Sequence, residues 1–191
     1  MPSCYNLLLQ RHGEDHAAVA TSYNNLALVF DTLGEYSKAK ELHEKALLIR
    51  KKSFGEDHAD VATSYNGLAS VYIRLGQYNQ AKELYEKALT ICKKIFGEDH
   101  ADVATRYNNL ALVYDTLGEY NQAKELHEKA LLIRKKIFGE DHADVATSYN
   151  NLTLVYNTLG WIQSSQRTSR KSTFSSQKDF WWRSCRCSNK L

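Results

Sequence analysis

The string Gly-Glu-Asp-His occurs four times in this chain at a strict spacing of 42 residues, beginning at Gly13, Gly55, Gly97 and Gly139. Residues 97–118 and 139–160 differ only at the pairs Arg106/Ser148, Ala111/Thr153 and Asp115/Asn157. A fixed period of this length is typical of stacked supersecondary units, each of which buries its apolar face only against its neighbours. The sequence therefore predicts a tandem array over residues 13–160 rather than a conventional globular domain.

Each unit reads as two helices. In the second unit, apolar residues recur at spacings of three and four from Ala59 to Leu75 (helix A) and again from Gln77 to Ile95 (helix B), the period of amphipathic helices. Gly76 lies between them and can adopt the positive φ that ends a helix. Because each helix B must also be covered by the next helix A, we expect an all-α, right-handed solenoid of antiparallel helix pairs. Residues 13–160 would hold three pairs and a fourth helix A, Ala143 to Leu159.

The turn between units carries a cluster of polar residues, Glu98, Asp99, His100 and Asp102. Carboxylates and imidazole are metal ligands, so a metal site is one interpretation. The alternative is that the carboxylates cap the following helix and interact with its positive dipole end. We favour capping, because the Glu-Asp-His part of the cluster recurs in every unit, and we expect no metal.

A family resemblance rests on nine residues of the second unit: Tyr65, Leu68, Ala69, Tyr72, Gly76, Tyr78, Ala81, Tyr85 and Ala88. In order and spacing they resemble the tetratricopeptide pattern, whose usual unit is shorter. The longer period and the segments 99–104 and 108–111 are similar to the kinesin-light-chain and nephrocystin-like subtype, apart from Ala101, where that subtype commonly has Pro. The resemblance implies a tetratricopeptide-like superhelix over residues 13–160 that binds proteins or peptides.

In tetratricopeptide proteins helix A lines the inner face, so the resemblance implies a peptide-binding groove there. The candidate groove residues are Asn24, Asn25, Asn66, Arg74, Asn108, Asn109, Asp115, Asn150 and Asn151. Amide side chains both donate and accept, so a row of asparagines suits an extended peptide held through its main chain. The alternative is that one asparagine of each pair ties neighbouring helices together. We expect the outer lysines of helix B, Lys82, Lys87, Lys124 and Lys129, to remain solvated.

Composition argues against several other functions. Residues 1–160 hold 18 Lys and Arg against 21 Asp and Glu, so the net charge of +3 comes from residues 161–191 and the array has no basic stripe for nucleic acid. No apolar run could cross a bilayer, and the cysteines show no disulfide framework. No nucleophile–base pair or phosphate-binding loop occurs. We expect a cytoplasmic protein that is not an enzyme, with no catalytic residues, no cofactor and no membrane association.

The two ends of the chain depart from the repeat. Residues 1–12 read as a partial helix B of a truncated unit, through Leu7, Leu8 and Leu9. Residues 161–191 break the period. If they are reverse-translated with free choice of codons and read one nucleotide later, the new frame permits most of another repeat unit. Trp181 and Trp182, which have a single codon, give two glycines in that frame. We interpret this segment as an out-of-frame repeat that remains disordered. The fourth helix A would then lack its helix B and could mediate self-association.

Two functional interpretations follow. The first is a protein-interaction scaffold that binds a peptide segment in the helix-A groove. The second is a truncated, structurally incomplete product of an expanding repeat family, with no independent function.

Overall fold

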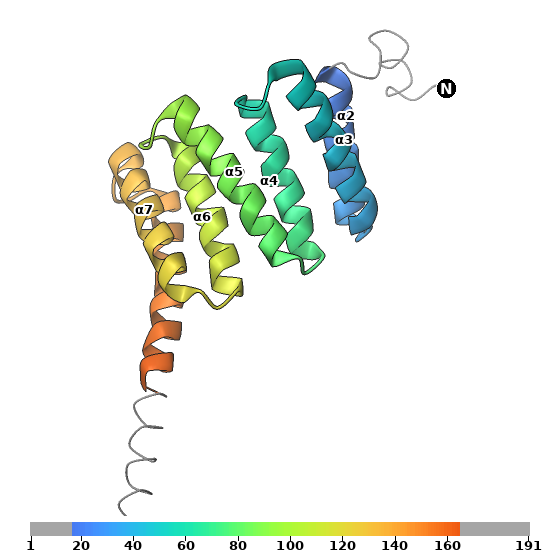
Figure 1. Ribbon diagram of the computed structural model, residues 1–191. Coiled ribbons are helices and arrows are strands. Elements are labelled where there is room, and N and C mark those ends of the chain that lie inside the picture. The colour runs from blue at the N-terminus through green and yellow to red at the C-terminus, as the bar shows by residue number, and fades with distance from the viewer. Residues whose placement is uncertain (1–16, 165–191) are drawn as a thin grey trace, which may run out of the picture.

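A computed structural model describes residues 17–164 and shows a stack of antiparallel helices, with no strand among these residues (Figure 1). The helices are α2 (Ala17–Thr32), α3 (Tyr36–Phe54), α4 (Ala59–Arg74), α5 (Tyr78–Phe96), α6 (Ala101–Thr116), α7 (Tyr120–Phe138) and a last helix over residues 143–164. Helices α2, α4, α6 and the last helix are the A helices, and α3, α5 and α7 are the B helices. The all-α solenoid expected from the sequence is confirmed.

The A and B helices meet through small side chains. On α5, Ala81 and Ala88 are completely buried, and they share one core cluster with Tyr65 of α4 and Tyr107 of α6. Close approach of two helices requires small residues where the larger ones of the partner insert. The core is therefore continuous from one repeat to the next, with each B helix packed between its own A helix and the following one.

The turn from helix A to helix B depends on a glycine. Gly76 has a φ of +72°, its N–H donates to Ile73 O at 3.0 Å, and the N–H of Gln77 donates to Tyr72 O at 2.8 Å. This is the hydrogen-bond pattern of a Schellman motif, which needs a residue free to take positive φ. Gly34 and Gly118 occupy the same place in their repeats, with φ of +78° each.

The capping of helix A differs from the sequence expectation. The cap of α6 is His100, whose Nδ1 accepts from the Asp102 N–H at 3.2 Å while its ring stacks on Phe96 at 4.5 Å. Glu98 instead pairs with Lys93 at 2.9 Å, and Asp99 pairs with Lys136. The prediction that Glu98 and Asp99 cap the helix was wrong, because α6 begins at Ala101 and its N-cap position is therefore residue 100.

The last helix continues to residue 164, beyond the expected end at Leu159, and its lower part extends past the stack (orange in Figure 1). Gly160 is helical here and does not take the positive φ of Gly34, Gly76 and Gly118. The residues after it no longer include the Glu/Gln-Tyr pair that begins each helix B, so nothing in the described chain turns back. Trp161 is 71% exposed. Residues 161–164 were expected to belong to a disordered tail over 161–191 and are helical instead. The expectations for residues 1–12 and for the rest of that tail, 165–191, lie outside the described residues.

Candidate functional site

The predicted groove residues all lie on A helices, and four of them are paired with each other. Asn109 Nδ2 on α6 donates to Asn66 Oδ1 on α4 at 3.0 Å. Asn151 Nδ2 on the last helix donates to Asn108 Oδ1 on α6 at 2.8 Å. These bonds tie successive A helices together, as the alternative interpretation of the asparagines predicts. Each amide uses one of its two polar atoms in the pair, so the other atom remains available to a ligand.

The first repeat cannot make the same bond, because the second repeat has Gly67 where the later ones have Asn109 and Asn151. A Cβ at Gly67 would lie 2.9 Å from the ring of His43. Asn24 contacts that ring instead. With the amide nitrogen donating to His43 Nδ1 at 3.0 Å, the oxygen accepts from Arg50 at 2.8 Å. The row of asparagine pairs therefore begins only at the second repeat.

The remaining predicted residues are not brought together. Asn25 and Asn150 are exposed, and Arg74 is exposed at the end of α4, where it makes no ion pair with any residue in the described part of the chain. Asp115 is half-buried, and burial raises the pKa of its carboxyl group. The structure thus gives Arg74 and Asp115 no shared site.

A row of exposed leucines accompanies the asparagines. Leu28 is 57% exposed, Leu112 is 44% exposed and Leu154 is 64% exposed, each four residues after the first asparagine of its repeat. Residues four apart lie on the same side of a helix. The second repeat has Ser70 at this position. We call the asparagine row and the leucine row together the helix-A face.

Sequence reasoning missed the polar groups at the junctions between repeats. At the α3–α4 junction Arg50 is buried and donates to Ser64 Oγ at 2.7 Å, and at the junction of α7 with the last helix Arg134 donates to Ser148 Oγ at 2.7 Å. At the α5–α6 junction these two positions carry Cys92 and Arg106. The guanidinium group therefore comes from helix B at two junctions and from helix A at the middle one.

The same junctions bury an ionisable ring in helix B. His127 is 1% exposed, and its Nδ1 has no hydrogen-bond partner among the described residues. Burial, with Arg134 as a second cause, lowers the pKa of His127 from 6.5 to about 4. Burial also lowers the pKa of His43. The middle junction has Tyr85 at this position. The repeats thus differ from one another at the histidine, arginine and serine positions of the junctions, and comparing the repeats there could have identified these polar groups from the sequence.

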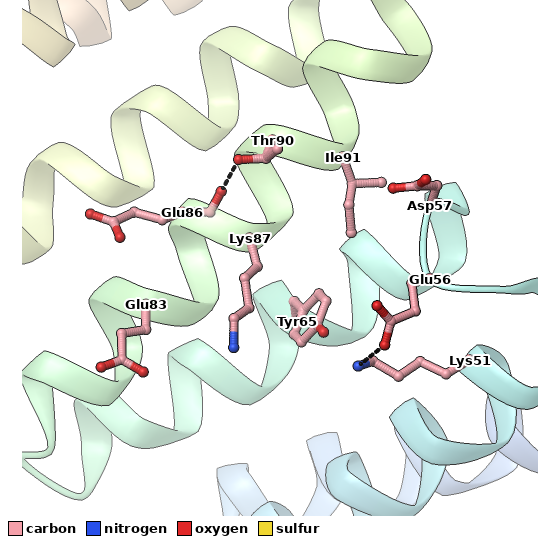
Figure 2. A pocket seen from close by; sticks show the side chains of 9 residues that line it. All are labelled: Lys51, Glu56, Asp57, Tyr65, Glu83, Glu86, Lys87, Thr90 and Ile91. Atoms are coloured by element: carbon pink, nitrogen blue, oxygen red, sulfur yellow. Dashed lines mark hydrogen bonds and ion pairs between the residues drawn. The ribbon is translucent and has the colours of Figure 1, made fainter.

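The outer face of the stack contains a cleft of about 570 Å³, which Figure 2 shows with Lys51 and Lys87 on either side of Tyr65. Lys51 Nζ lies 5.2 Å and Lys87 Nζ 6.0 Å from the centre of the Tyr65 ring. Hydrogen bonding to Tyr65 first, and then to Glu56, raises the pKa of Lys51. A smaller cleft of about 210 Å³ surrounds Tyr107 one repeat later, with Leu132 in the place of Thr90.

This packing changes the interpretation of the outer lysines. Their Nζ atoms lie over tyrosine rings at 4.4 Å for Lys82, 6.0 Å for Lys87, 5.0 Å for Lys124 and 5.9 Å for Lys129. In these cation–π contacts a lysine of a B helix lies over the electron-rich ring face of a tyrosine on a neighbouring A helix. Lys87 and Lys129 are exposed, as expected, whereas Lys82 and Lys124 are half-buried.

The described part of the chain, residues 17–164, contains no group of three or more His, Cys, Asp or Glu side chains arranged to hold a metal ion. It also contains no helix that is both long and apolar enough to span a bilayer.

Comparison with known proteins gives consistent matches to one kind of repeat. The tetratricopeptide repeat model matches residues 3–52, 32–94, 60–131 and 117–172. No curated protein matches the chain.

Among solved structures, the chain is similar to BtubC (BKLC) from P. vanneervenii, with 33% identity and a TM-score of 0.70 over 78% of this chain and 59% of that one. The chain thus spans about three-fifths of that relative. A single-substitution variant of the nearly identical TPR-like repeats of a Podosopora anserina putative kinesin light chain is 26% identical, with a TM-score of 0.73 over 85% of this chain and 77% of that one. The first TPR of Spaghetti (RPAP3), bound to an HSP90 peptide, shares 14% identity and a TM-score of 0.56 over 76% of this chain and 96% of that one.

Proposed function

Because the chain belongs to the tetratricopeptide repeat family, we propose that it is a protein-interaction scaffold that holds an extended segment of a partner protein on the helix-A face. The observation that carries this proposal is the exposed leucine row beside the row of asparagines. Apolar side chains that lie beside hydrogen-bonding amides give this face the mixed chemistry that a peptide-binding surface uses. The peptide complex of the Spaghetti domain supports only the capacity of this fold to hold a peptide.

The chemistry of the face suits a peptide in extended conformation. The amide atoms of Asn66 and Asn108 that are not used in the asparagine pairs can bond to the peptide main chain. Leu112 and Leu154 can then contact alternate apolar side chains of the same segment. Main-chain bonds would supply affinity and the leucines selectivity, so we expect partners with spaced apolar residues.

The test begins with selection of peptides that bind the full chain from a displayed library, followed by calorimetry on purified variants. The triple variant N66A/N108A/N150A should weaken binding more than about tenfold, because each lost amide that pairs with a buried peptide group costs about 1–3 kcal/mol. Asn66 and Asn108 also tie helices, so melting temperatures must accompany the affinities. Leu112→Ser is the matched second variant, because it installs the residue that the second repeat already has at Ser70.

Charge reversal of Lys82, Lys87, Lys124 and Lys129 serves as the control on the other face and should leave peptide affinity unchanged. Binding that survives both helix-A variants and disappears on this charge reversal would place the site in the outer clefts. A folded chain that selects no peptide would favour the second interpretation, a structurally incomplete product.

A further inference from the structure

The second and third repeats differ at few positions, and their buried differences lie where one repeat stacks on the next. Residues 55–96 and 97–138 differ at nine positions, five of them in 55–76 and four in 77–96. The differences in which at least one residue is buried are Ser64/Arg106, Tyr85/His127 and Cys92/Arg134. All of them belong to the junctions between repeats. The apolar core therefore gives successive repeats nearly the same stacking surface, and the polar junction residues distinguish them.

Similar stacking surfaces permit a competing arrangement, in which a B helix skips one repeat and packs on a later A helix. Such misassembly is a characteristic failure of repeat proteins. For α3, a skip of one repeat replaces α4 by α6. Arg50, which is buried, would then face Arg106 instead of the Ser64 hydroxyl to which it donates at 2.7 Å. A guanidinium group cannot accept a hydrogen bond, so the skip brings two like charges together and removes an acceptor.

The other skip of one repeat is unfavourable for the opposite reason. If α5 packed on the last helix, Tyr85 and Cys92 would face Ser148 instead of Arg106. In the native stack Arg106 lies near Tyr85: burial raises the pKa of the Tyr85 hydroxyl, and the charge of Arg106 opposes this rise. The skip would replace the long arginine side chain by a hydroxymethyl group beside the buried Cys92. Removal of a large side chain from a packed junction leaves a cavity and is destabilising.

A skip of two repeats would bring α3 onto the last helix, where the arginine meets a serine again. The second difference then lies at Gly67, whose counterpart on the last helix is Asn151. A Cβ at Gly67 would lie 2.9 Å from the ring of His43. At the third junction, where Asn151 is present, Nδ1 of His127 has no hydrogen-bond partner among the described residues. We therefore expect this skip to cost His43 the contact with Asn24 that it makes at 3.0 Å.

We propose that the alternating position of the arginine, on helix B at the first and third junctions and on helix A at the middle one, keeps these similar repeats stacked in sequence order. A uniform set of junctions is physically possible, because the arginine–serine contact has the same length of 2.7 Å at the first and third junctions. The stability of single junctions therefore does not require the exchange at the middle one. With the exchange, each skip of one repeat meets a mismatched pair that the native order avoids. This role concerns assembly of the array and is separate from peptide binding on the helix-A face.

The test is refolding of the full chain from urea, for the wild type and two double variants that each make the second and third repeats identical at two more positions. The junction variant, Cys92→Arg with Arg106→Ser, gives all three junctions the arginine–serine pair. Arg74→Thr with Gln77→Glu is the matched control, because both residues are exposed and lie outside the junctions. Val71→Ala controls for lower stability, since Val71 is 1% exposed and is not one of the polar junction residues.

Each protein is diluted rapidly from urea at several protein concentrations. Size-exclusion chromatography measures the fraction of monomer, and brief proteolysis measures the fraction of chains with a looped-out repeat. The junction variant should give severalfold more oligomer or protease-sensitive chain than the wild type and both controls. Cys92→Arg alone should lower the urea midpoint, because it builds the contact of two arginines into the native stack.

Equal fractions of native monomer in the wild type and the junction variant overturn the proposal. An equal loss in either control also overturns it, because misassembly would then follow from overall repeat similarity or from low stability. So does an unchanged midpoint for Cys92→Arg, which would mean that the junction tolerates two guanidinium groups. A junction variant that unfolds at a lower midpoint than both of its single variants overturns it as well, because arginine with serine would then not form an equivalent junction.

Discussion

The buried ring of His127 makes the stability of the third junction depend on pH. Its pKa is about 4 in the folded chain and returns to about 6.5 on unfolding. Between these values the unfolded chain binds a proton that the folded chain does not, so the free energy of unfolding falls as the pH falls from 6.5 to about 4. The difference between the two pKa values corresponds to roughly 3 kcal/mol. Above pH 6.5 this residue should give no further change.

The measurement is urea unfolding of the wild type and of His127→Tyr at several pH values between 4 and 7. The variant installs the side chain that α5 carries at Tyr85, so the ring remains large but no longer titrates in this range. We expect the pH dependence of the variant to be shallower than that of the wild type, with a remainder from His43, whose pKa is also lowered. Equal pH dependence in the two proteins would mean that the pKa of His127 is the same in the folded and unfolded chains.

At the scale of helix pairs, the position of the arginine distinguishes one junction from the next. Cys92→Arg alone would bring a second guanidinium group to the α5–α6 junction, beside Arg106, whose Nε is already buried without a partner. Arg106→Ser alone would leave positions 92 and 106 of the α5–α6 junction without any arginine. The double variant restores the Arg and Ser pairing that joins Arg50 to Ser64 at 2.7 Å. We therefore expect each single variant to be less stable than the double variant.

A double-mutant cycle measures this coupling from the free energies of unfolding of the wild type, the two single variants and the double variant. Residues in direct contact show interaction energies of about 0.5–3 kcal/mol, and the expected sign is favourable for the double variant. Additive effects would show that the two positions do not share one site. They would also show that the choice between Arg with Ser and Cys with Arg at these two positions does not affect how the repeats stack.

The period of the sequence was enough to predict the helices but not the contacts between repeats. Helix A of the second repeat was expected at Ala59 to Leu75 and is observed at Ala59–Arg74, because the glycine turn and the apolar spacing are both local signals. The pairing of Asn66 with Asn109 depends on how far one repeat is offset from the next, which no local pattern encodes. The His100 cap was missed for a similar reason, since its ring is held by stacking on Phe96 in the preceding helix.

At the scale of the whole molecule, both ends of the described stack expose surfaces that the middle repeats bury. Leu26 and Val29 of α2 are 43% and 51% exposed, whereas the corresponding Leu68 and Val71 are 4% and 1% exposed. A preceding helix B would cover this face, and the match to the tetratricopeptide model begins at residue 3. A partial helix B in residues 1–12 therefore stays a prediction. Stability in such a stack comes from nearest-neighbour contacts, so each uncovered end lowers it.

Replacing residues 161–191 by a copy of residues 119–138 should stabilise the array. The added helix B supplies two alanines to the side of the last helix that exposes Tyr149 and Thr153, as α7 supplies Ala123 and Ala130 to α6. Each apolar side chain that becomes fully buried contributes roughly 1.5–3 kcal/mol before the entropy of ordering the helix is subtracted. Urea unfolding should show a higher midpoint. The matched control carries Glu at both alanine positions of the added copy, which prevents close packing and should leave the midpoint unchanged. An equal gain from both versions would mean that the added segment stabilises the chain without covering Tyr149 and Tyr156.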